Sequence, residues 1–173
     1  WYMNQPSNDE YVYKYSGGLA TYTAKHRPFA IYSKEADKTF FCFGGSDEKN
    51  STLLHNISYY DHRKSTIANP TIILDKNTTD AHDNPVLSLD EKGFVWVFST
   101  SHGTTRPSYI YKSAKPYDIS KFKRVHATEM TKGIEQPFNN FSYFQVYHIN
   151  GKGFFVFFTR YQVVFAKRFI GYY

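Results

Sequence analysis

Residues 94–98 read FVWVF, a run that is apolar at every position. Two further runs have the same character, FFCF at residues 40–43 and FFVFF at residues 154–158. Successive side chains of a β-strand point to opposite faces of its sheet, so strands of this kind must be covered on both faces. Helical periodicity is nearly absent from the chain, so the cover has to come from other sheets. Sheets stacked on sheets, as in a sandwich or a propeller, are therefore expected.

Short apolar runs of strand length recur along the chain, and turn signals such as Gly44-Gly45, residues 90–93 and Asn150-Gly151 separate them. Aromatic residues make up 20% of the sequence, which also favours β structure. The sequence thus predicts an all-β protein. Strands are expected at residues 28–32, 39–43, 53–60, 71–74, 85–89, 94–98, 109–111, 144–149, 154–158 and 163–165.

A weak internal repeat favours a propeller over a sandwich. Three units begin at His26, His82 and Phe141, and each has a strand, a polar turn, a second strand and a polar loop. Later strands, including residues 122–125, supply the third and fourth strands of the first two blades, so four-stranded antiparallel blades are expected at about residues 26–75 and 82–126. The third blade, at about residues 141–173, runs out at Tyr173. We expect one partial β-propeller domain over residues 1–173. Three blades do not close a propeller, which usually needs about four to eight, so a piece of a larger protein is expected.

Charge and cysteine content limit the classes of partner. The net charge is +6 with 21 Lys and Arg residues, which makes an anionic partner plausible: nucleic acid, acidic lipid or acidic polysaccharide. The basic residues are scattered, so they indicate a diffuse positive field around a cleft rather than a polybasic arm. The single cysteine, Cys42, is expected to be a buried small hydrophobe. No zinc-ligand spacing, membrane-spanning run or signal peptide is visible, and no cofactor is predicted.

Polar side chains recur at equivalent positions of the three units. In a four-stranded meander, the loop before the first strand and the loop after the second strand emerge at the same end. His26, His82 and Tyr143 lie at or before first strands, whereas His102 and Arg160 follow second strands. We expect these groups to gather at one mouth of the central channel. Each has a structural alternative: a turn cap for His82, a strand cap for His26, an exposed loop residue for His102, a surface ion pair for Arg160 and a core position for Tyr143.

Two more residues of the second unit belong to the same end. Arg106 lies in the loop after His102, and Tyr109 opens the third strand. Together with His26 they are candidates for substrate binding. The other histidines, His55, His62, His126 and His148, lie in strands or at the opposite end and are expected to be structural.

This set of side chains suits β-elimination from a uronic acid. Histidine titrates near neutrality and can abstract a proton, tyrosine can deliver one, and arginine can neutralise a carboxylate. Glycoside hydrolysis would more typically use two carboxylates. The only acidic residues at the expected mouth are Asp80 and Asp83, so elimination is favoured.

The chain resembles the BNR-type propeller family that includes ulvan lyases. The resemblance covers roughly residues 15–161, and its most specific part is the combination of DAHDNP with SHG…RPSYI. It rests on KYSGGLATYTAKHRPFAIY, KTFFCFGG, ISYYDH, DAHDNPVLSLDEKGFVWVFSTSHGTTRPSYIYKS, KPYDI and GKGFFVFFTRY. The Asp-box S-x-D-x-G-x-T-W is absent, so the sequence does not support sialidase activity.

The resemblance implies a seven-bladed, secreted or periplasmic polysaccharide lyase. Its substrate would be a sulfated, uronate-containing polysaccharide such as ulvan, with neither nucleic acid nor membrane as partner. By motif, the catalytic residues are His82, His102, Tyr143 and Arg160, with Tyr147 as the alternative tyrosine. A structural metal in a part of the propeller absent from this chain is compatible with the pattern. A propeller that binds carbohydrate, or another partner, without cleaving it is the alternative function.

Overall fold

The computed structural model describes residues 26–46, 52–162 and 167–173, and this part of the chain is built from antiparallel β-sheets. The first sheet contains β1 (Ala30–Ser33), β2 (Lys38–Ser46) and β3 (Leu53–Asp61), in that order, and β3 also pairs with β4 (Thr66–Ile67) and β5 (Thr71–Asp75). The second sheet follows chain order through β6 (Pro85–Leu89), β7 (Val95–Ser99), β8 (Tyr109–Ser113) and β9 (Phe122–Val125). The third contains β12 (Ser142–Ile149), β13 (Gly153–Tyr161) and β14 (Arg168–Tyr172).

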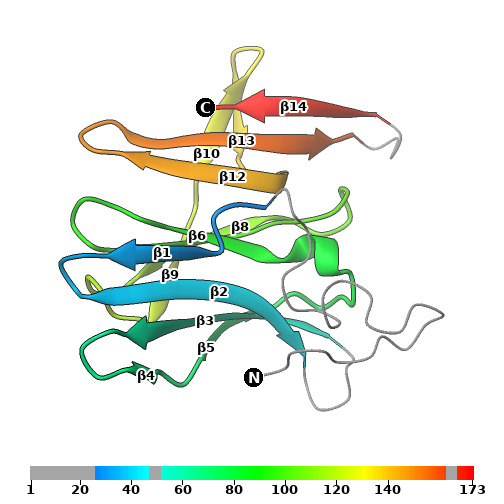
Figure 1. Cartoon of the computed structure of the whole chain (residues 1–173). Helices are drawn as coiled ribbons and strands as arrows, with labels where there is room; N and C mark the ends of the chain where they lie inside the picture. The colour runs from blue at the N-terminus through cyan, green and yellow to red at the C-terminus, as the bar shows by residue number, and fades with distance from the viewer. Residues whose placement is uncertain (1–25, 47–51, 163–166) are drawn as a thin grey trace.

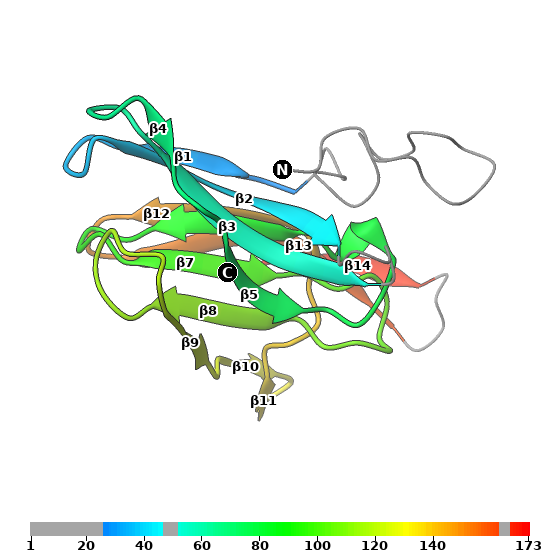
Figure 2. The ribbon, with the colours of Figure 1, turned by 90° about the horizontal axis from the view of Figure 1, so that it is seen from below.

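The three sheets stack face to face like successive blades (Figures 1 and 2). The FVWVF run lies in the middle sheet and divides its side chains between two cores. Val95 and Val97 pack with Phe40 and Ile57 of the first sheet, whereas Trp96 and Phe98 pack on the third-sheet side. The first strand of the middle sheet, β6, contacts β2 on one side and β12 on the other. The all-β propeller fold predicted from the sequence is confirmed.

The outermost sheet differs from the expectation that FFVFF would be covered on both faces. Val156 and Phe158 are buried in the core shared with the second sheet. Phe155 and Phe157 point the other way and are 37% and 38% exposed. The third sheet ends the stack in the described residues, so no further sheet covers them there (Figure 1).

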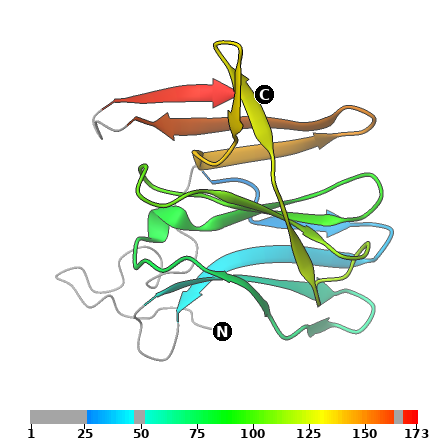
Figure 3. The same ribbon diagram turned by 180° about the vertical axis from the view of Figure 1, so that it is seen from behind.

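Several local predictions need correction. Gly44 and Gly45 lie inside β2 rather than in a turn, and a Cβ on Gly45 would come within 2.6 Å of the Asn56 amide nitrogen. A hairpin of β10 (Thr128–Thr131) and β11 (Ile134–Pro137) runs from the second sheet towards the third (Figure 3). These strands were not expected because they are polar and exposed. The run at residues 163–165 falls outside the described residues, and β14 follows it.

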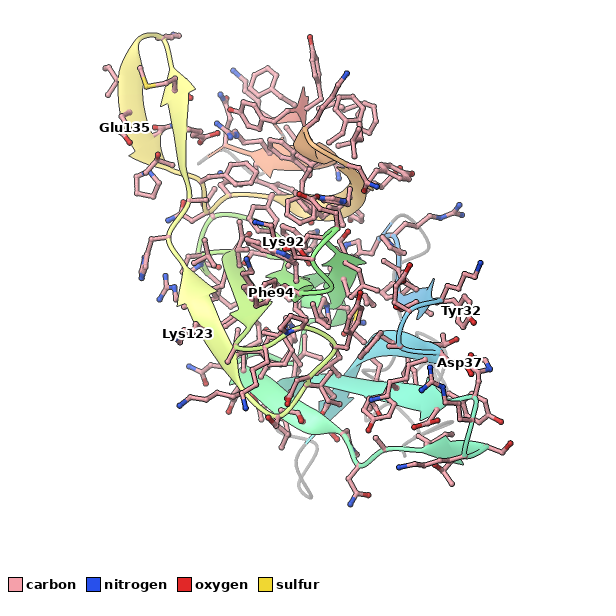
Figure 4. The ribbon with its side chains drawn as sticks, turned by 90° about the vertical axis from the view of Figure 1, so that its left-hand side faces the viewer. Tyr32, Asp37, Lys92, Phe94, Lys123 and Glu135 are labelled. Atoms are coloured by element: carbon pink, nitrogen blue, oxygen red, sulfur yellow. The ribbon has the colours of Figure 1, made fainter. Side chains whose placement is uncertain are left out.

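The tight turns between first and second strands lie together at one end of the stack. Figure 4 looks onto that end, where Tyr32 and Asp37 of the first sheet and Lys92 and Phe94 of the second are labelled. The Tyr32 hydroxyl donates to the Asp37 carboxylate at 3.0 Å. The opposite end is where the sheets begin, and it carries the candidate site.

Gly93, in one of these turns, is expected to tolerate no side chain. Its φ is +81°, and an added Cβ would lie 2.2 Å from the ring of Tyr117. Gly93→Ala therefore adds overpacking to the backbone cost and should lower the free energy of unfolding by about 2–4 kcal/mol. Urea denaturation checks this. Gly151→Ala is the matched control, because φ is +71° there and no atom lies within 4 Å of its Cβ; a loss as large as at Gly93 would contradict the steric argument.

Candidate functional site

The segments before the first strands and after the second strands of the sheets lie at one end of the molecule, as the meander predicts. The turn η1 (Ala81–Asp83) precedes β6 and carries His82, and His102 follows β7. Tyr143 lies at the start of β12. The structure brings these three side chains together although they belong to two different sheets.

His82 and His102 form a stacked pair. Their ring centroids are 4.2 Å apart with an interplanar angle of 16°. Both Nδ1 atoms face the carboxylate of Asp80, at 2.5 Å from Oδ1 for His82 and 2.9 Å from Oδ2 for His102. Partial burial disfavours the ionised carboxyl, but the hydrogen bonds from His102 and His82 outweigh it and hold the pKa of Asp80 well below its usual range. One carboxylate thus orients both imidazoles.

Asp83 anchors the loop that carries His102. Its carboxylate is fully buried, accepts from the His102 backbone amide at 2.6 Å and receives the Arg106 Nε at 2.8 Å. Arg106 Nη2 also lies 3.7 Å from Asp80, so the two acidic groups share one guanidinium. The hydrogen bond to Asp83 raises the pKa of Arg106. Arg106, predicted to bind substrate, therefore stands beside the histidine pair but is engaged by protein carboxylates.

Tyr143 stands edge-on to both histidines. Its ring centroid lies 6.2 Å from that of His82 and 6.3 Å from that of His102. The strand is irregular here, because Tyr143 has a φ of 47° and the pairing register with β13 shifts between Ser142 and Gln145. Such a bulge re-aims a side chain relative to a regular strand. Tyr147, the alternative, is 48% exposed and lines a separate hollow of about 660 Å³ on the first strands of the sheets.

Arg160 is already paired with a protein carboxylate, which differs from its interpretation as a carboxylate clamp free to bind substrate. It forms an ion pair with the Glu129 carboxylate of β10, which is nearly buried and also accepts from the Tyr173 hydroxyl at 2.7 Å. Arg160 lies on the same face of β13 as Phe158. The next residue, Tyr161, is buried, and its ring lies 5.3 Å from that of His102.

Two predicted substrate-binding residues also have other surroundings. His26 is fully buried, so its direct contact with substrate is corrected to a role within the protein. Tyr109 does open β8, and its ring lies beneath the Lys76 ammonium at 5.0 Å and the Arg124 guanidinium at 4.2 Å. Its ring is thus covered by two cations of the protein itself.

Sequence reasoning missed three groups that support the site. The sequence showed Asp80 and Asp83 only as acidic residues near the expected mouth. Their closeness in sequence to His82 could have indicated that a carboxylate orients the imidazole. Lys76 carried no signal, since it looks like an ordinary loop lysine. It is buried between the first two sheets, where its ammonium donates to Ser101 Oγ at 2.8 Å and to the Pro107 carbonyl at 2.7 Å. Burial lowers the pKa of Lys76 to about 7.

The family of the chain follows from comparison with known proteins. A model of the BNR repeat-containing family matches residues 55–163, which is more than half of the chain. The chain belongs to the BNR repeat-containing family. No curated protein matches the chain.

A solved structure shares the fold of this BNR-repeat chain. It is described as a new family of polysaccharide lyase, PL25 ulvan lyase, bound to -[GlcA(1-4)Rha3S]-. The TM-score is 0.61 at 17% sequence identity, and the match covers 79% of the present chain. The chain spans about a third of the length of that lyase, 32%. At this identity the likeness shows the propeller fold alone.

Among the described residues of this BNR-repeat chain, Asp80, His82 and His102 could also hold a metal ion, since their ligand atoms all lie within 4.8 Å of one another. The donor set of two imidazoles and a carboxylate is chemically suitable for a divalent transition metal. The Arg106 guanidinium beside the same carboxylate opposes a second cation. Hydrogen bonding to Asp80 already accounts for the arrangement of the two rings.

Buried neutral histidines are expected to make the fold sensitive to mild acid. Burial lowers the pKa of His26 to about 3 and that of His55 well below 6.5. As the pH falls through 6.5, the unfolded chain gains protons that the folded chain does not. The free energy of unfolding should then drop towards pH 3 by about 1.4 kcal/mol per pH unit for each such histidine. Urea titrations from pH 7 to pH 5 check this, and a flat profile would contradict it.

In addition, the described residues include no helix long and apolar enough to cross a membrane.

Proposed function

We propose that this BNR-repeat protein is a polysaccharide lyase, or part of one, that cleaves an anionic, uronate-containing glycan by β-elimination. The observation that carries the proposal is the stacked pair of His82 and His102 on one carboxylate, with the Tyr143 ring edge-on to both. A secreted or periplasmic location belongs to the same proposal, because such polymers are encountered outside the cytoplasm.

The shared carboxylate of Asp80 fixes the two imidazoles relative to one another. Hydrogen bonds from both rings to this one carboxylate hold the rings side by side, with their centroids 4.2 Å apart. Both rings can therefore act on the same bound sugar. One ring can neutralise a substrate carboxylate while the other accepts a proton.

The reaction can be written with these groups. The imidazolium binds the uronate carboxylate and makes the proton on C5 more acidic. The neutral imidazole removes that proton, the electron pair forms the C4–C5 double bond, and the C4–O bond breaks. Tyr143 donates a proton to the departing glycosidic oxygen and is left as a tyrosinate. The imidazole that took the C5 proton then releases it, and Tyr143 is reprotonated through solvent. No step requires the guanidinium of Arg160.

Hydrolysis fits the same residues less well. Hydrolysis would need two carboxyl groups that flank the glycosidic bond, one as the acid and the other as the base or nucleophile. Asp80 is held by both histidines, and Asp83 is fully buried against Arg106 and a backbone amide. Within the described part of the chain, these are the acids next to the histidine pair.

The ulvan lyase of known structure supports the proposal, because it shares the fold of this chain and was solved with a glucuronate-containing oligosaccharide.

The pairing of Arg160 favours a second candidate function, a propeller that binds an acidic glycan without cleaving it. The Glu129 carboxylate neutralises this arginine, so the permanent cation predicted to clamp the substrate carboxylate is already paired within the protein.

Incubation with ulvan and a panel of uronate glycans tests the proposal. Near-ultraviolet absorbance of the unsaturated product should rise with time, and reducing ends should appear in parallel. Absence of both signals with every glycan would contradict lyase activity. Calorimetric binding of the same glycans without product, unaffected by His82→Ala, would identify the binding propeller instead.

A further inference from the structure

We infer that His26 is a positioning residue: its imidazole joins the backbone carbonyl of Asn84 to the backbone amide of Tyr143 and thereby holds the Tyr143 ring against the histidine pair. The inference deepens the proposed function by adding a residue that touches no substrate. It stands on buried contacts between two sheets.

Both ring nitrogens of His26 have backbone partners. Nδ1 lies 3.1 Å from the Asn84 carbonyl oxygen, and Nε2 lies 3.1 Å from the Tyr143 amide nitrogen. A carbonyl can only accept, so Nδ1 carries the hydrogen; an amide N–H can only donate, so Nε2 is bare. The two contacts together select one neutral tautomer. The ring is 0% exposed, so no water competes for either contact.

The contact falls on the irregular residue of β12. Tyr143 has a left-handed backbone with a φ of 47°, which is unfavourable for a residue other than glycine and persists only where the surroundings hold it. The register shift between Ser142 and Gln145 takes this residue out of the regular ladder with β13. His26 accepts from its amide and also packs edge-on against its ring, with centroids 5.6 Å apart.

The other partner of His26 belongs to the segment that carries the histidine pair. Asn84 directly follows Asp83, which binds the His102 amide and Arg106. The residues after His26 also bond to both sheets. The Arg27 amide donates to the Phe144 carbonyl of β12, and the Leu87 amide of β6 donates to the Pro28 carbonyl. Residues 26–28 therefore join β6 to β12, and His26 is the side chain at the site end of that junction.

The tautomer can be measured without reference to activity. Long-range proton–nitrogen NMR spectra of the whole chain should show His26 with a protonated Nδ1 and a bare Nε2 at pH 6. An imidazolium, or a hydrogen on Nε2, would overturn the inference. This measurement uses the wild-type chain, so it does not depend on the folding of a variant.

Two amide substitutions separate the two contacts. The glutamine oxygen of His26→Gln reaches the position of Nε2 and can accept from the Tyr143 amide, whereas His26→Asn reaches only the position of Nδ1. Hydrogen exchange at the Tyr143 amide should accelerate at least tenfold more in His26→Asn than in His26→Gln. His62→Asn is the matched control: His62 is exposed, bonds Thr39 at 2.8 Å and lies in the turn between β3 and β4.

The kinetic readout should follow the same order. His26→Asn is expected to lower kcat by about 10- to 100-fold with KM changed little, since it displaces an acid without removing a substrate contact. His26→Gln should recover part of that loss. Equal exchange rates in the two variants, or a wild-type kcat in His26→Asn, would refute positioning. If the wild-type chain cleaves no glycan, the proposed function fails, while the tautomer and the exchange rates still decide the role of His26.

Discussion

Alanine at His82 or at His102 is expected to lower turnover of a uronate polysaccharide by about 10²–10⁴-fold, the usual contribution of a general acid or base. The two losses should be similar in size, because the rings share Asp80 and act as one acid–base pair. The double variant should then lose little more than either single one, since residues that act as a unit are non-additive. Initial rates of absorbance increase, measured at saturating glycan, give the comparison.

His148→Ala is the matched control for this experiment. His148 is also mostly buried and paired with an acid, its Nε2 lying 2.7 Å from Glu91. That pair involves the turn at the opposite end of the second sheet, so activity should stay within about twofold of wild type. Retained turnover in both His82→Ala and His102→Ala would place the chemistry elsewhere in the molecule.

Removal of one hydroxyl should show which of the two candidate tyrosines, Tyr143 or Tyr147, is the general acid. Tyr143→Phe is expected to lower kcat by about 10²-fold or more because the leaving oxygen loses its proton donor. The phenylalanine ring keeps the edge-on contacts with His82 and His102, so the fold and KM should change little. Stopped assays over the first few per cent of conversion would measure the difference.

Tyr147→Phe, four residues along the same strand, provides the comparison. Its ring is about half exposed and lines the hollow beside β1 and β6, so its hydroxyl should not affect kcat. A larger loss at Tyr147 than at Tyr143 would assign the acid to Tyr147 and would require substrate to lie along the first strands. Thermal unfolding of both variants shows whether either loss reflects stability.

Much of the fold could be predicted because strands and blades are local patterns. FVWVF alternates between two cores as its composition requires, and strands such as β6 and β8 begin at the predicted residues. Hairpin connectivity then brings the starts of the sheets to one end, and His82, His102 and Tyr143 do meet there. Strand β14 and the hairpin of β10 and β11 were missed since their residues are polar or exposed and show little alternation.

The errors at the site have a different origin. Arg160 and Tyr161 are neighbours in sequence, but Arg160 pairs with Glu129 whereas Tyr161 packs against His102. The partner that each of these side chains meets depends on how β13 packs against the rest of the protein, which no local pattern specifies. His26 was expected at the surface of the mouth, and it is buried because residues 26–28 lie between two sheets.

Composition and periodicity were sufficient for the all-β class, the blade repeat and the end of the molecule at which the polar residues gather. These properties follow from short-range rules: side chains alternate along strands, and tight turns reverse the chain. Tertiary structure alone decided that Asp80 joins the two histidines, that Asp83 holds their loop, and that Arg160 pairs with Glu129. Hydrogen bonds between side chains require positions within about 3 Å, and only the packing of separate sheets sets positions to that precision.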